Sequence, residues 1–506
     1  MQVSSGTTPD RTAALVLFLA ALLSYACFSQ STENPNTRTR MFLTLALIQD
    51  GSTKIDGYHE YTLDRAVFAD HYYSEKAPGL SFAAIPAVAA GLWVIGRDVE
   101  MFDAQGNATV AFERLTYLST LATSGVFGAL AVLAVYLLSI EFGVGRSGAG
   151  FAAIALAWGT PLWGWATAFL GHAMTAGCLS LGLLMLVRAT RDHPPGWPGR
   201  SLLAGVSGAL LAWAVVVEFT AAGAVALLLA FGAWRAWRLP VRQRIWLAAA
   251  TAISALIFLA PLFIYNASSF GSPWHFGYTY TESWYPAMKE GFVGFSVPSL
   301  SVMGELLFGR YRGIAWVSPL SLAAYGAGFW LVFRSSAEIR PAILLCLFIA
   351  LYYLVLNSSY AYWDGGWSSG PRHLTASLPL LALPLGLAWR DSPALLRAFL
   401  AALLLTSIAL SLMWASTSMF APDFFKDALN IFLLPSFEAR LAGAPVPRIG
   451  AFAFVAPWEL PWPRPVALWA VALIPAIASA CVAWRLRSSR PGIKYPAQDR
   501  NGAARR

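Results

Sequence analysis

The sequence predicts an all-α, polytopic integral membrane protein that crosses the bilayer about 12 times. Of its 506 residues, 57% are hydrophobic and only 12% are charged, whereas a soluble domain carries roughly 25% charged residues. The mean hydropathy is +0.57, and the apolar residues fall in runs of about 20, the length that a helix needs to cross the hydrocarbon core. A soluble enzyme, a disordered protein and a fibrous protein are therefore excluded.

Twelve apolar runs are candidates for membrane-spanning helices. They cover residues 12–28, 114–140, 149–167, 171–188, 201–217, 219–233, 245–266, 313–333, 341–356, 373–389, 397–414 and 466–484. The first run lacks a small-residue cleavage site, so we expect a retained span and not a removed signal peptide. No shift in composition divides the chain, which predicts one membrane domain over residues 1–486 and a short basic tail over 487–506.

A further apolar run, 77–95, is ambiguous because Pro78, Gly79 and Pro86 interrupt it. Lys and Arg concentrate in the cytoplasmic loops of membrane proteins. If the N-terminus is cytoplasmic, this rule places the basic loop 235–244 and the basic tail inside only when 77–95 does not span. We therefore predict a re-entrant or interface-lying pair of short helices on the outer side, with both chain ends on the cytoplasmic face of the cell (inner) membrane.

The same topology places the large loops on the outer side of the membrane. These loops cover residues 30–112, 267–312, 357–372 and 415–465, whereas the cytoplasmic loops are short. Residues 37–50 place apolar side chains along one helical face, which predicts a helix lying in the membrane interface. Chemistry is expected outside the membrane or near its outer surface. Because the net charge of +9 belongs to membrane loops, we expect no nucleic-acid partner.

The first outer loop carries the candidate catalytic residues. Glu33 follows the first span closely, where partial desolvation would raise its pKa into the range of a general base; an exposed acid at a helix end is the alternative. Asp64 is the reserve candidate for this base. Lys76 precedes the Pro-Gly break and could bind a lipid phosphate, although a snorkelling lysine explains the position equally well. Arg38 and Tyr73 are further candidates for substrate contact.

Two later loops and one span end supply the other candidates. In the stretch YAYWDGGWSSGPRHL, the ring of Trp367 suits a sugar and Arg372 can bind a phosphate; an aromatic belt with a tight turn is the alternative. In the stretch FGRYRG, Arg310 and Arg312 are candidate phosphate ligands or a snorkelling pair. His172 opens the fourth span near the outer face, and ionisable residues at such depth are often functional.

The order of these features resembles the GT-C superfamily of membrane glycosyltransferases. Glu33 follows the first span, an interfacial helix comes next, and Lys76-Ala77-Pro78-Gly79 leads into an apolar hairpin. Over about the first 200 residues and two later loops, the pattern is similar to the branch of the lipid A aminoarabinose transferases and protein O-mannosyltransferases. The chain departs from that branch where Ala-Pro replaces Pro-Pro and where a single acid stands in place of an Asp-Glu pair.

The resemblance implies transfer of a sugar from a polyprenyl-phosphate-linked donor to an envelope glycan, lipid or protein acceptor on the outer (periplasmic) face. The leaving phosphate needs cations, which Lys76, Arg372 and the arginines of FGRYRG can supply, and the acceptor hydroxyl needs a base. A divalent cation could assist, but no metal-ligand spacing requires one. Two alternatives stay open: a transporter or flippase of lipid-linked sugars, which usually carries an internal repeat not found here, and a non-catalytic assembly factor for envelope polysaccharide.

Overall fold

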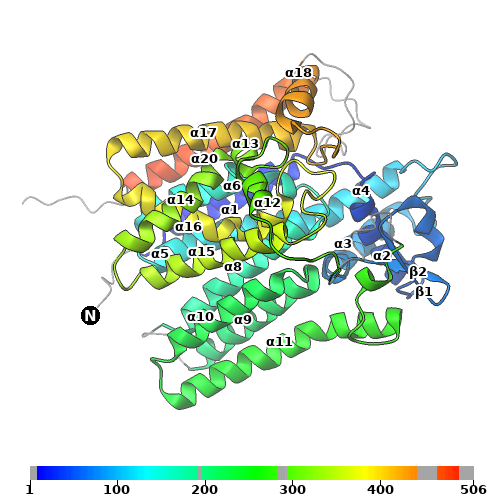
Figure 1. The fold of residues 1–506 in the computed structure, drawn as a ribbon, viewed down its shortest axis with the longest axis horizontal. Coiled ribbons are helices and arrows are strands. Elements are labelled where there is room, and N and C mark those ends of the chain that lie inside the picture. Colours follow the sequence, from blue (N-terminus) through cyan, green and yellow to red (C-terminus); the bar gives the residue numbers. More distant parts are fainter. Residues whose placement is uncertain (1–7, 192–196, 283–290, 292, 442–463, 489–506) are drawn as a thin grey trace, which may run out of the picture.

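The computed structural model describes residues 8–191, 197–282, 291, 293–441 and 464–488, and it is mostly helical (Figure 1). Its α-helices are α1 (Arg11–Ala26), α2 (Pro35–Gln49), α3 (Gly79–Ile95), α4 (Val110–Thr120), α5 (Val126–Glu141), α6 (Gly145–Trp158), α7 (Leu162–Trp165), α8 (Gly171–Ala189), α9 (Trp197–Val217), α10 (Ala221–Ala236), α11 (Val241–Phe270), α12 (Leu300–Phe308), α13 (Ile314–Val317), α14 (Pro319–Arg334), α15 (Arg340–Ser358), α16 (Leu378–Asp391), α17 (Ala394–Thr417), α18 (Leu434–Leu441) and α20 (Arg464–Ser488). Shorter helical turns are η1 (Asp56–Tyr61), η2 (Leu121–Gly125), η3 (Gly277–Tyr280), η5 (Arg372–Ser377) and η6 (Ala428–Leu433). The multi-helix architecture predicted from the apolar runs is therefore present.

The helices that follow the twelve predicted runs differ in length. Among the described residues, six helical segments are long and apolar enough to cross a membrane: Val110–Glu141, Gly171–Ala189, Pro198–Val217, Val241–Phe270, Arg340–Ser358 and Ala394–Thr417. The run 149–167 is not one helix, because α6 ends before a Thr-Pro pair and α7 begins after it; proline cannot donate a backbone hydrogen bond. The total of about 12 spans, the membrane orientation and the division at residue 486 stay predictions.

The run 77–95 forms one continuous helix, α3, and the prediction of two short helices is wrong. Pro86 lies inside α3. The helix continues past it because one missing N–H leaves the other hydrogen bonds of the helix intact. The helix ends at Gly96, whose φ of +100° suits glycine best. α3 packs against α2 and α4 near the end of the bundle that carries the strands (Figure 1).

The predicted interfacial helix is α2, but it is buried on all sides and not along one face. Residues 37–46 are all buried, because α3, η1 and a strand pack around α2. The side chain of Asn34 accepts hydrogen bonds from the backbone N–H groups of Asn36 and Thr37, and Pro35 occupies the first helical position. Both features are typical of a helix start. This burial carries two arginines, Arg38 and Arg40, into the protein interior.

A small β-hairpin departs from the all-α expectation. Strand β1 (Arg65–Phe68) pairs antiparallel with β2 (His71–Ser74). The turn residues Ala69 and Asp70 have φ of 50° and 59°, as in the two-residue turns that match the twist of a hairpin. The hairpin was not predicted, because Ala-Asp lacks the glycine that usually marks such a turn.

The predicted outer loops contact one another at the end of the bundle where α2 and the hairpin lie (Figure 1). The backbone contacts that join them include the bridges Ala66–Thr281 and Phe295–Tyr360, and the hydrogen bond from Ser368 N–H to the Ala421 carbonyl. Segments far apart in the sequence therefore meet in one place. This assembly forms the site described below.

The contact between α3 and α9 gives a first testable prediction. A Cβ atom at Gly79 would lie 2.6 Å from the carbonyl carbon of Val216, and a backbone atom cannot move aside as a flexible side chain can. Gly79→Ala should therefore destabilise the protein by about 1–3 kcal/mol, measured by thermal unfolding in detergent. Gly304→Ala is the control, because nothing lies within 4 Å of a Cβ there. Equal stability of the two variants would contradict the close packing.

Candidate functional site

A cavity of about 650 Å³ lies where the outer segments meet. Its walls come from the start of α2, the segments flanking the hairpin, the start of α8, the α9–α10 turn, the end of α15 and the loop before η5. Its polar lining includes Glu33, Asn36, Arg40, Asp64, Glu75, Lys76, His172, Glu218, Tyr278, Tyr353, Asn357, Tyr360, Arg372 and His373. Glu33, Lys76 and Arg372, three of the candidates named from the sequence, all line it.

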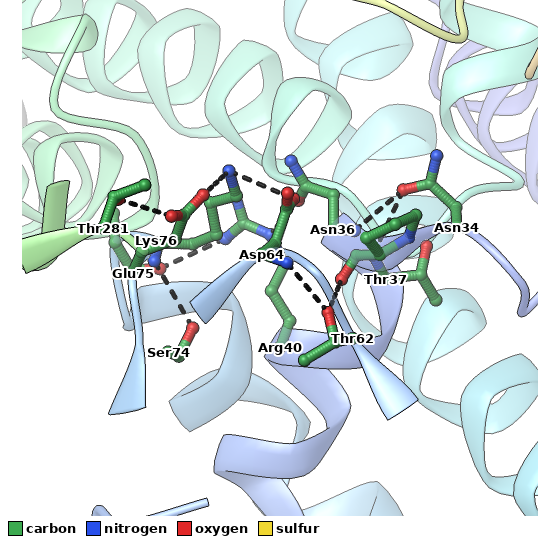
Figure 2. A network of polar contacts seen from close by, with 12 residues as sticks. Asn34, Asn36, Thr37, Arg40, Thr62, Asp64, Ser74, Glu75, Lys76 and Thr281 are labelled. Carbon is green, nitrogen blue, oxygen red and sulfur yellow. Dashed lines mark hydrogen bonds and ion pairs between the residues drawn. The ribbon is translucent and has the colours of Figure 1, made fainter. Parts of the chain in front are cut away.

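One wall carries a lysine held between two carboxylates. Figure 2 shows the Lys76 ammonium between Glu75 and Asp64. The ammonium lies 3.1 Å from Asp64 Oδ2, and the side chains of Lys76 and Asp64 are each only 10% exposed. Thr281 donates a hydrogen bond to the other oxygen of Glu75. Lys76 is therefore a paired, buried cation and not a lysine that snorkels to water.

The environment of this cluster shifts two pKa values. Burial lowers the pKa of Lys76, but the negative charges of Asp64 and Glu75 outweigh it and hold that pKa well above its ordinary range. Burial, with the Asp64 charge beside it, raises the pKa of Glu75 although Lys76 opposes the shift. Lys76 is therefore a fixed positive charge at the cavity wall.

Two buried arginines face the same cavity without a carboxylate partner among the described residues. Arg40 Nε donates to Asn36 Oδ1 at 2.9 Å, and its Nη1 donates to the Ala77 carbonyl at 3.1 Å. Arg372 is 7% exposed, and its Nε has no hydrogen-bond partner. Burial, together with the Arg372 charge, lowers the pKa of Arg40. A buried charge is stable only when it is compensated, so this part of the cavity is suited to an anion.

The deep part of the cavity carries two histidines. His172 Nδ1 lies 2.6 Å from Glu218 Oε1, and both side chains are nearly buried. The His172 ring meets the His373 ring edge-on, with centroids 5.7 Å apart. The span-end histidine predicted from the sequence therefore lies in the cavity, paired with an acid from the α9–α10 turn.

Glu33 and its neighbour Arg38 lie differently from the expectation. Arg38 Nη2 donates to Glu33 Oε2 at 2.6 Å, and the Glu33 side chain is 61% exposed. Arg38 also donates to the carbonyls of Thr32 and Tyr61 and does not line the cavity. Arg38 thus anchors the segment around the start of α2, and Glu33 lies at the cavity rim in contact with water, not desolvated as predicted.

Three other sequence candidates lie outside the cavity lining. Arg312 is buried, and its Nε and Nη2 donate to the carbonyls of Asp364 and Gly366, so it positions the glycine-rich loop. Arg310 is 69% exposed and lies 3.6 Å from an Asp427 oxygen. Tyr73 packs its ring against Phe270. By contrast, Trp367 lines the cavity and is about half exposed.

Several lining residues were not candidates from the sequence. Arg40 lies two positions after Arg38. It was not a candidate because the sequence did not indicate that both sides of α2 are buried. Tyr353 and Asn357 lie four residues apart and therefore share one face of α15, but Tyr353 stands within the apolar run 341–356 and Asn357 directly follows it. Among the described residues, no three His, Cys, Asp or Glu side chains converge to hold a metal ion.

Solved structures share this arrangement of helices. ArnT from Cupriavidus metallidurans in the apo state superposes with a TM-score of 0.53 at 16% identity, covering 94% of this chain and 75% of ArnT. The same protein bound to undecaprenyl phosphate gives a TM-score of 0.51 at 15% identity, covering 95% and 79%. The chain therefore shares the fold of ArnT at low sequence identity. No protein-family model matches the sequence, and no curated protein matches it. The resemblance seen in the sequence is thus present in the fold.

Proposed function

We propose that the chain transfers a sugar from a polyprenyl-phosphate-linked donor to an envelope glycan, lipid or protein acceptor on the outer face of the membrane. The observation that carries this proposal is the pair Arg40 and Arg372, two buried guanidinium groups that face a cavity without a carboxylate partner among the described residues. A donor phosphate would supply the missing negative charge through charge-assisted hydrogen bonds. The fold shared with ArnT, which binds undecaprenyl phosphate, supports this class of ligand.

The cations would act on the leaving group. When the bond between the anomeric carbon and the phosphate oxygen breaks, its electron pair passes to the phosphate. Arg40, Arg372 and the fixed charge of Lys76 would stabilise this developing negative charge more strongly than that of the intact donor. The apolar part of the lining, which includes Val217 and Phe219, would hold the start of the polyprenyl chain.

The acceptor hydroxyl attacks the anomeric carbon and must lose its proton. We assign the base to Asp64, the reserve candidate from the sequence, in place of Glu33. Asp64 is nearly buried and lies beside Lys76, next to the proposed phosphate. Glu33 is mostly exposed and is paired with Arg38, and bulk water at this position would compete with the acceptor. Trp367 at the half-exposed mouth offers a ring face for a sugar acceptor.

The binding part of this proposal is tested with undecaprenyl phosphate and purified protein in lipid nanodiscs. Arg372→Gln should raise the dissociation constant about 100-fold, because it removes a desolvated charge pair that is worth roughly 2–5 kcal/mol. Arg397→Gln is the control, since this arginine is exposed and donates to carbonyls at the far end of α16. Absence of binding to the unmodified protein would contradict the proposal. Binding without transfer of any sugar would favour the transporter alternative.

A further inference from the structure

The inner wall of the cavity carries polar atoms without partners. Both side-chain atoms of Asn357, the hydroxyl of Tyr353 and Nε2 of His373 are buried and form no hydrogen bond. Tyr353 and Asn357 are 2% and 3% exposed, and all three residues line the cavity. An unsatisfied buried polar group is costly, and native proteins rarely keep several together. Their convergence on one cavity indicates a polar ligand that completes them.

These groups are uncharged, and together they offer both hydrogen-bond donors and acceptors. The Asn357 amide offers two donors and an acceptor, and the Tyr353 hydroxyl offers both a donor and an acceptor. An imidazole nitrogen of His373 can donate or accept, depending on its tautomer. Sugar hydroxyl groups likewise donate and accept, so they can satisfy all these atoms at once. A carboxylate only accepts hydrogen bonds and an ammonium group only donates them, so neither would satisfy both the donors and the acceptors.

The charged groups nearby are already engaged. Glu218 is paired with His172 at 2.6 Å, so it is not available to a cationic amino sugar. The cations Arg40 and Arg372 are the proposed ligands of the donor phosphate. His373 follows Arg372 directly at the start of η5, so a sugar attached to that phosphate would reach this wall.

We propose that Tyr353, Asn357 and His373 form the sugar subsite of the donor, and that this subsite takes an uncharged, hydroxyl-bearing sugar. The Tyr360 ring, whose centroid lies 5.8 Å from that of His373, lines the same wall and offers an apolar face for the ring carbons of the sugar. The inference rests on the proposed function, because the sugar enters this subsite only when its phosphate is held beside Arg372.

The test compares four probes on the purified protein in nanodiscs: undecaprenyl phosphate, undecaprenyl phosphate glucose, and the corresponding donors with a cationic amino sugar and an anionic uronic acid. We expect the glucose donor to bind about tenfold more tightly than bare undecaprenyl phosphate. Asn357→Leu should remove this gain, because an apolar side chain of similar size leaves the hydroxyl groups unpaired. The same variant should bind bare undecaprenyl phosphate as the unmodified protein does.

Two further variants keep the test decisive. Tyr353→Phe removes only a hydroxyl, so it reports on the subsite even if Asn357→Leu folds poorly. Val355→Ala, on the exposed side of the same helix and outside the cavity, should change neither affinity. Tighter binding of either charged donor than of the glucose donor, or equal losses for bare and glycosylated lipid, would overturn the inference while leaving the proposed function intact. Failure of every polyprenyl phosphate to bind would instead overturn the proposed function.

Discussion

Asp64→Asn should reduce sugar transfer by about 10²–10⁴-fold, the range lost when a positioned general base is removed. The amide keeps the size of the carboxylate but cannot accept the proton of the acceptor hydroxyl. Lys76 keeps its contact with Glu75 in this variant, so the cation remains in the cavity wall. The dissociation constant of undecaprenyl phosphate should therefore change by less than about threefold. Transfer is measured with a labelled polyprenyl-phosphate sugar in reconstituted vesicles.

Glu33→Gln is the matched control for this prediction, because it makes the same chemical change at the cavity rim. Its effect on transfer should stay below about tenfold, since an exposed ion pair such as Glu33 with Arg38 contributes little energy. If Glu33→Gln abolishes transfer and Asp64→Asn does not, the base is Glu33. Near-normal transfer by both variants would exclude both carboxylates from the role of base.

Local patterns in the sequence predicted the helices better than the site. An apolar run fixes a helix through its own composition, so α8, α9, α15 and α17 follow their predicted runs closely. Pro86 misled the prediction for α3, because the helix continues past this exposed proline and is not broken by it. The hairpin was missed since its Ala-Asp turn adopts positive φ without a glycine. In both cases proline and glycine, the residues that usually mark breaks and turns, were an unreliable guide.

The candidate site was only partly predictable for a related reason. Lys76 stood out because it lies two residues before a Pro-Gly break, and Arg372 because it ends a glycine-rich loop. Nothing in the sequence around Arg40 separates it from other arginines. Its place in the site depends on its proximity to Arg372, which belongs to a distant segment, and no local pattern indicates that proximity. Arg312 looked equally suitable as a phosphate ligand. Its Nε and Nη2 instead donate to the carbonyls of the loop that it supports, and it lies outside the cavity lining.

Lys76→Met should destabilise the protein by about 3–5 kcal/mol, because it leaves the carboxylates of Glu75 and Asp64 buried without their cation. The loss is measured by reversible unfolding in mixed detergent micelles. Adding Glu75→Gln and Asp64→Asn to the same chain should recover most of it, since a buried amide carries no charge. Lys54→Met is the control, as this partly exposed lysine of the same loop contacts His71 and no carboxylate in the described structure.

The stability lost in Lys76→Met should depend on pH because of Glu75. Its pKa is raised by burial above the ordinary value of 4.5, so the folded protein binds this proton more tightly than the unfolded chain. Stability due to this group is therefore greatest at low pH and declines as the pH rises from about 4.5 through the raised pKa. Removing Lys76 removes the charge that opposes the shift. The stability difference between Lys76→Met and the unmodified protein should hence be larger at pH 8 than at pH 5, and a difference independent of pH would show that the ion pairs around Lys76 do not stabilise the fold.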